Sequence, residues 1–254
     1  MKVDKTVDKW KAPAKNDARL LGMPNIPQPL HGPGCQPRTI VGTSIWNQMR
    51  IKCYEDAGYK CEACGFQGEP GKAQVHAHEV FSINYKTGES KFERLCCLCR
   101  RCHLGVIHSG RALTQYGKGM IPFQDMLNNA EHGFKIVSEY NKTHKRQIYM
   151  FNTIQEWGSK CPELKEPLAK LIDQYGIKFY GVVNKRHGAC DWGDWKMIFN
   201  GREYPTPYKD ASEWEKAMEK MNEKQGRGLM QKRMSGGAFD ELDKLLKGEE
   251  DVTN

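Results

Sequence analysis

The chain has 254 residues, which is enough for one large domain or two small ones. Apolar residues make up 39% and charged residues 28% of it, no apolar run approaches the roughly 18 residues of a membrane-spanning helix, and its polar, Lys-rich start has no export signal. We therefore exclude fibrous, membrane and secreted proteins and expect an intracellular one. The formal net charge of +8 is compatible with a polyanionic partner such as nucleic acid but does not require one.

Residues 1–35 are expected to form an arm that packs on the domain or hangs from it, because several prolines disfavour a regular element. A helix is expected next, since Thr43 or Ser44 can cap its N-terminus and Gly58 can end it. Its apolar stripe would consist of Ile45, Met49 and Cys53, with Trp46 alongside.

Ten cysteines without an export signal favour metal binding or redox chemistry over disulfides. Two C-x-x-C pairs stand out, Cys61 with Cys64 and Cys99 with Cys102, and four thiolates are the shell that tetrahedral zinc requires. Such a shell leaves no open coordination position, so this zinc would be structural. Cys96 and Cys97, next to the second pair, are either core residues or competing ligands.

The stretch between the two pairs reads as a hairpin. Gln74–Phe81 has the period of a strand that places His76 and His78 on one face, residues 86–89 supply a turn, and Lys91–Leu98 returns as a second strand. A helix follows from Arg100. Zinc would therefore staple a ββα unit that is too small to bury its own core.

Two further histidines, His103 and His108, fall on that helix. Imidazoles and a carboxylate, Glu79, that converge from a strand and a helix can bind a divalent cation and leave one histidine free as a base. Five residues of a regular α-helix turn through about 500°, however, so the rings of His103 and His108 are expected to point apart.

The rest of the chain is predicted to be mainly helical, followed by a basic linker and a short amphipathic helix. The expected elements are helices at 123–140, 163–175 and 212–225, a strand at 178–183, an aromatic core stretch at 192–199, a linker at 224–233 and a terminal helix at 237–246. Cys161, His187 and Cys190 match no closed ligand set and are interpreted as structural.

With these motifs in place, the sequence resembles the HNH endonuclease family, in particular its phage-associated and bacterial members. The resemblance rests on the C-x-x-C pairs, His78-Glu79 and Cys102-His103, together with the stretches 29–32, 37–42, 108–111 and 195–201. The family's middle Asn has no counterpart here, and Ala77 precedes the candidate base where the family usually has Asp or His.

The resemblance implies an α+β fold with a zinc-stapled, treble-clef-like ββα-metal core and a mainly helical C-terminal region. It also implies metal-dependent hydrolysis of phosphodiester bonds in DNA, by nicking or double-strand cutting, with RNA not excluded. His78 would be the base, and His108, together with His76 or Glu79, would hold Mg²⁺ or another divalent ion. His103 would complete that shell or orient the N-terminus of the helix. The candidate nucleic-acid contacts are Arg100, Arg101 and Arg111.

The expected organisation is an arm (1–35), an HNH domain (36–145), a C-terminal α+β region with possible DNA contacts (146–223), and the linker with the terminal helix (224–254). Two alternatives stay open. The protein is either a non-catalytic, zinc-stapled nucleic-acid-binding protein with a degenerate site, or an interaction protein that docks a partner through the helix at 237–246.

Overall fold

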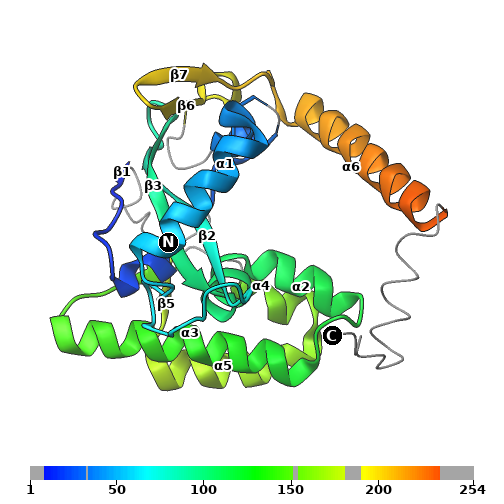
Figure 1. Ribbon diagram of the computed structural model, residues 1–254. Helices are drawn as coiled ribbons and strands as arrows, with labels where there is room; N and C mark the ends of the chain where they lie inside the picture. Colours follow the sequence, from blue (N-terminus) through cyan, green and yellow to red (C-terminus); the bar gives the residue numbers. More distant parts are fainter. Residues whose placement is uncertain (1–8, 33, 151–153, 181–189, 235–254) are drawn as a thin grey trace, which may run out of the picture. The chain divides into compact units, whose positions relative to one another are not determined.

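The computed structural model describes residues 9–32, 34–150, 154–180 and 190–234 and has the expected mixture of helices and strands (Figure 1). The chain divides after Pro207 into two compact units, a division that falls at none of the expected domain boundaries. The candidate site lies wholly within the first unit, so this unit is described first.

The main sheet of the first unit has five strands in the order β1-β2-β3-β6-β7. The strands are β1 (Lys9–Trp10), β2 (Val75–Asn84), β3 (Glu89–Cys99), β6 (Lys196–Phe199) and β7 (Arg202–Pro205). β2 and β3 form the expected hairpin and pair antiparallel over their whole length, whereas β3 and β6 pair in parallel. β1 pairs only with Ile83 and Asn84, so no strand in the described part of the chain covers the outer edge of β2 from Val75 to Ser82.

Alternation along β2 sends neighbouring side chains to opposite faces of the sheet. Val80 packs into a core on one face and Phe81 into a separate core on the other. His76 and His78 share the face of Val80, and Ala77 and Glu79 share the face of Phe81. The histidines and the carboxylate of this strand therefore start from different sides of the hairpin.

Helices cover the face of Val80 (Figure 1). They are the π-helix η4 (Arg101–Ile107), α2 (Ser109–Gly117), α3 (Phe123–His144), α4 (Ile154–Lys160) and α5 (Pro162–Tyr175). A two-stranded parallel ribbon, β4 (Tyr149–Met150) with β5 (Lys178–Phe179), completes this side. Phe134 and Trp157 are fully buried in its core, and Trp157 Nε1 donates a hydrogen bond to the Ser109 carbonyl at 3.1 Å.

The second core lies on the face of Phe81 and contains Trp195, Met197 and Phe199. The interpretation of residues 192–199 as core is thereby confirmed. The N-terminal arm packs on the domain, because Leu20 is fully buried in the first core and Leu30 in the second. The arm also contains two short 3₁₀ helices, Ala18–Gly22 and Gln28–Leu30, where no regular element was expected.

The helix α1 (Pro37–Asp56) differs from its prediction in its start and at one position of its apolar stripe. It begins at Pro37, six residues ahead of Thr43, and Gly42 interrupts it with a φ of 77° that favours glycine. The expected apolar stripe is wrong at Ile45, whose side chain is 52% exposed, while its neighbour Trp46 is buried. The other two positions of the stripe face the protein as predicted, since Met49 packs against the second core and Cys53 is half-buried.

In the second unit, α6 (Ala211–Met234) continues through residues 224–233, where a linker was expected. Two glycines in this stretch cost a helix about 1 kcal/mol each, and the Lys, Gln, Arg and Met residues around them are good helix formers. The predicted terminal helix at 237–246, His187 and residues 181–183 of the predicted strand lie outside the described residues. None of the helices described is long and apolar enough to cross a membrane.

Candidate functional site

Four cysteines converge where the hairpin meets η4. Cys61 and Cys64 come from the turn ahead of β2, Cys99 ends β3, and Cys102 lies in the first turn of η4. Their four Sγ atoms lie within 4.8 Å of one another, which is close enough to hold a metal ion. The fold therefore brings together the four cysteines that were predicted to bind zinc.

The chemistry of this cluster suits a metal cation. Hydrogen bonds among the four thiols lower the pKa of Cys61, to about 7, and that of Cys99, and they raise the pKa of Cys102 and contribute to the raised pKa of Cys64. Without a cation the cluster therefore favours thiolates at two of its four positions. The thiolate is the form that binds metal. A tetrahedral set of four sulfur ligands is typical of zinc.

The surroundings hold the cysteine cluster in place. Glu62, inside the first C-x-x-C pair, is buried, accepts a hydrogen bond from the Cys97 amide at 3.1 Å and forms an ion pair with Arg94 at 2.8 Å. On the opposite side, His132 Nε2 of α3 lies 3.4 Å from Cys102 Sγ. Cys97 and its neighbour Cys96 are buried and belong to neither group of metal-competent residues among those described.

A second group consists of three histidines. The ring nitrogens of His78 from β2, His103 from η4 and His108, which directly follows η4, lie within 4.8 Å of one another. Their ring centroids are 4.7 to 5.1 Å apart. His78 Nδ1 is buried and has no hydrogen-bond partner in the described part of the chain, as expected of a ligand atom without its ion.

The π-helix η4 explains why His103 and His108 meet, contrary to expectation. In a π-helix the amide of each residue bonds to the carbonyl five residues earlier, and the His108 amide donates to the His103 carbonyl at 2.9 Å. Residues five apart therefore lie one above the other, whereas a regular α-helix would separate them. Gly105, in the middle of η4, also allows α3 to approach, since a Cβ atom there would lie 2.7 Å from the Asn129 side chain.

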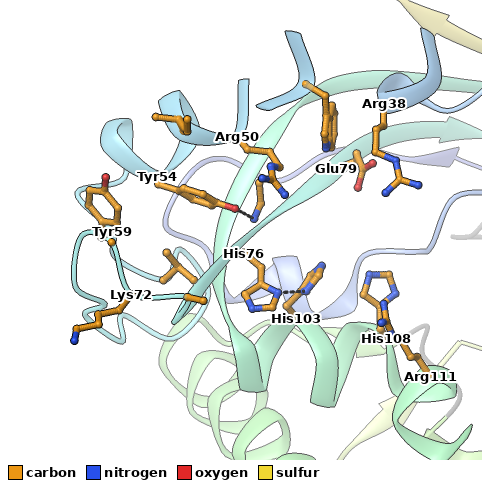
Figure 2. A pocket seen from close by; sticks show the side chains of 16 residues that line it. Arg38, Arg50, Tyr54, Tyr59, Lys72, His76, Glu79, His103, His108 and Arg111 are labelled. Carbon is orange, nitrogen blue, oxygen red and sulfur yellow. Dashed lines mark hydrogen bonds between the residues drawn. The ribbon is translucent and has the colours of Figure 1, made fainter. Parts of the chain in front are cut away.

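His76 lies beside the group of three histidines. Its Nδ1 is 3.1 Å from His103 Nδ1, so one of the two imidazoles donates a hydrogen bond to the other (Figure 2). The sequence interpretation paired His76 with His108 as metal ligands and kept His78 as the base. The structure instead groups His78 with His108 and leaves His76 half-buried at the edge of the group.

Glu79 does not join the histidines. It projects from the other face of β2 and lies near the Arg38 guanidinium (Figure 2). Burial raises the pKa of its carboxyl. The expected arrangement of a carboxylate beside His108 on one cation is therefore replaced by a purely imidazole donor set.

Burial also lowers the pKa of all four histidines, to about 3 for His103 and about 4 for His108. Neighbouring cations add to this effect, with Arg111 acting on His103 and His108. The imidazoles are therefore neutral at pH 7. Neutral imidazole is the form that donates a lone pair to a metal or accepts a proton.

His76, His103 and His108 line a cavity of about 710 Å³ between α1 and the η4–α2 segment (Figure 2), whereas His78 is buried and does not belong to its lining. Four basic side chains line it without a matching number of acids, namely Arg38, Arg50, Lys72 and Arg111. Of the three arginines predicted to contact nucleic acid, only Arg111 lies here. Arg100 and Arg101 line a separate cavity of about 520 Å³, where the Arg101 guanidinium donates to the Asn128 carbonyl at 2.9 Å.

Sequence reasoning missed the contribution of α1 to this cavity, although Arg38 falls inside the stretch 37–42 that carried the family resemblance. The chain matches no protein-family model, no curated protein and no solved structure. Any function therefore has to be argued from the chemistry of the site.

Proposed function

We propose that the protein is a metal-dependent endonuclease of the HNH type that hydrolyses phosphodiester bonds in DNA. The observation that carries this proposal is the group of three imidazoles, two of which, His103 and His108, line a basic cavity. Three ligands leave coordination positions free, as catalytic metal sites do, and basic walls favour a phosphate-bearing substrate. The hairpin, the following helical segment and the cysteine cluster support the HNH-like ββα-metal reading of the sequence.

We assign His78, His103 and His108 as the ligands of the catalytic cation. A cation held there would activate a water molecule and neutralise charge on the scissile phosphate. Imidazole donors suit zinc and neighbouring transition metals, whereas Mg²⁺ prefers oxygen ligands. We therefore propose Zn²⁺, Mn²⁺ or Co²⁺ as the active ion in place of Mg²⁺.

We assign His76 as the residue that positions His103. It is half-buried and lies at the cavity outside the group of three. Its hydrogen bond with His103 orients that ligand, as outer-shell partners of metal-binding histidines do. Arg38 and Arg111 are placed to bind the phosphate.

The test is cleavage of supercoiled plasmid by the zinc-loaded protein with Mn²⁺, Co²⁺, Zn²⁺, Mg²⁺ or EDTA. Wild-type protein and the variants His108→Gln and His76→Gln are compared with His144→Gln, a matched control at an exposed histidine on α3. We expect divalent-dependent nicking or linearisation that is lost in His108→Gln, weakened in His76→Gln and kept in the control.

Zinc content and circular dichroism establish that each variant is folded. Absence of cleavage by folded, metal-loaded wild-type protein on plasmid and on RNA would refute the endonuclease and favour the non-catalytic binding protein. Cleavage that survives in His108→Gln would refute the assignment of the metal ligands.

A further inference from the structure

The cavity extends from the histidines along α1, and its far end has a chemistry that phosphate binding alone does not explain. Trp46, Arg50 and Tyr54 recur at intervals of four along α1, so they form one face of the helix, and all three line the cavity. The far end is completed by Tyr59 and Lys72 (Figure 2). Aromatic and basic side chains thus alternate along this wall.

The aromatic part is held rigidly next to the histidines. The Tyr54 hydroxyl accepts a hydrogen bond at 3.2 Å from the amide of Ala77, the residue between His76 and His78. This bond is available because the outer edge of β2 is not covered by another strand here. The Tyr59 ring lies 6.3 Å from the Tyr54 ring, tilted by 35°, so the two form a bent platform.

The basic part includes a donor without a partner. Arg50 Nε is buried and makes no hydrogen bond within the described residues, and burying an unpaired donor of this kind is costly. A phosphate oxygen in the cavity would satisfy it. Lys72, at the exposed end, adds a second cation next to the tyrosines.

Taking the proposed endonuclease as its basis, we infer that this wall binds an unpaired strand of DNA, with a base stacked on Tyr54 and Tyr59 and the adjoining phosphate on Arg50. Alternating aromatic rings and cations are what single-strand binding sites use, because every base has a face that can stack. In an intact duplex the bases are stacked on one another and cannot reach the rings. The preferred substrates are therefore single strands, flaps and gaps.

The experiment measures binding and cleavage separately. Fluorescein-labelled single-stranded DNA, its blunt duplex and a gapped duplex are titrated with zinc-loaded protein without added divalent ion, and binding is followed by fluorescence anisotropy. The three DNAs are then offered for cleavage with Mn²⁺. The variants are Tyr59→Leu, which removes the ring, and Tyr59→Phe, which keeps it.

We expect the single-stranded and gapped DNA to bind at least about fivefold more tightly than the duplex, since stacking contributes roughly 1–3 kcal/mol per base. Tyr59→Leu should remove that preference and Tyr59→Phe should keep it. Equal affinity for duplex and single strand, or an unchanged preference in Tyr59→Leu, would overturn the inference.

The outcomes separate the two proposals. A ring-dependent preference for unpaired DNA without any cleavage would leave the binding wall standing and refute the endonuclease. Cleavage of intact duplex as fast as of the gapped DNA would support the endonuclease and refute the binding wall.

Discussion

The cysteine cluster and the histidine group lie on the same hairpin and the same helix. They differ in how completely their side chains surround the position where a metal ion would sit. Four sulfur atoms surround the first position, next to a buried Glu62–Arg94 ion pair. Three nitrogen atoms surround the second, which opens into a basic cavity. One supersecondary unit therefore carries two different donor sets, a four-sulfur set enclosed by the protein and a three-nitrogen set at the edge of a cavity.

Removing one cysteine of the four-cysteine cluster should have the largest effect on the stability of the protein. Cys102→Ser removes one of four ligands at the junction of β3 and η4, and we expect the protein to lose its zinc and its cooperative unfolding transition. Structural zinc contributes an apparent 10–16 kcal/mol, roughly, in zinc-finger peptides, more than a domain can lose. Zinc content and thermal unfolding by circular dichroism measure the effect.

The matched control is Cys161→Ser, a half-buried cysteine outside both groups of metal-competent residues. It should retain zinc and melt within a few degrees of wild type. A Cys102→Ser protein that melts like this control would show that the cysteine cluster is an ordinary part of the core.

Removing only the accessible metal should abolish activity and spare the fold. Three neutral imidazoles should release a cation to a chelator of moderate strength while four thiolates keep theirs. Losing partners of metal ligands already costs roughly 10–100-fold in affinity or activity, so loss of the ion itself should cost more than about 100-fold in the cleavage rate.

Activity of the treated protein should return with Mn²⁺, Co²⁺ or Zn²⁺ and not with Mg²⁺ alone. Metal content before and after treatment, read together with the circular dichroism spectrum, assigns the loss to one group. In His108→Gln the same treatment should release no further ion. Unfolding during the treatment would contradict the prediction that the chelator removes the ion from the histidine group and leaves the ion in the cysteine cluster.

A smaller effect is expected from the glycine that lets η4 lie against α3. Gly105→Ala puts a Cβ atom 2.7 Å from Asn129, and overpacking of this kind costs about 1–3 kcal/mol of the free energy of unfolding. Because η4 carries His103, we also expect weaker binding of the second cation. Urea unfolding and calorimetric titration with Zn²⁺ measure the two quantities.

Gly117→Ala is the matched control, since nothing lies within 4 Å of the added atom at the end of α2. It should be neutral or raise the free energy of unfolding by about 0.4–1 kcal/mol. If the two variants have the same free energy of unfolding and the same affinity for Zn²⁺, then the Asn129 side chain can move aside and the position of η4 does not depend on this contact.

The two groups also differ in how far the sequence predicts them. C-x-x-C spacing fixes the geometry of each cysteine pair locally, and the antiparallel pairing of β2 with β3 brings the pairs together, so both the cysteine cluster and the hairpin could be predicted. The histidine group depends on η4 being a π-helix. Spacing on a regular α-helix gives the opposite result for His103 and His108, so their convergence with His78 could not be predicted from the sequence.

The basic wall was missed for a related reason. The apolar stripe of α1 was read through Ile45, whereas Trp46, Arg50 and Tyr54 form the face that lines the cavity. A shift of one residue turns an α-helix by about 100°, so the predicted stripe and the cavity wall are neighbouring faces of α1. The polar residues of the second face gave no amphipathic signal by which it could be predicted.

The adjacency of Cys102 and His103 has a consequence for assembly. The two side chains are consecutive in the first turns of η4, so the thiolate shell that anchors Cys102 also sets the direction from which the His103 imidazole approaches its neighbours. Zinc in the cysteine cluster is then a precondition for the second cation. The protein should therefore fill its sites in a fixed order, with the cysteine cluster first and the histidine group second.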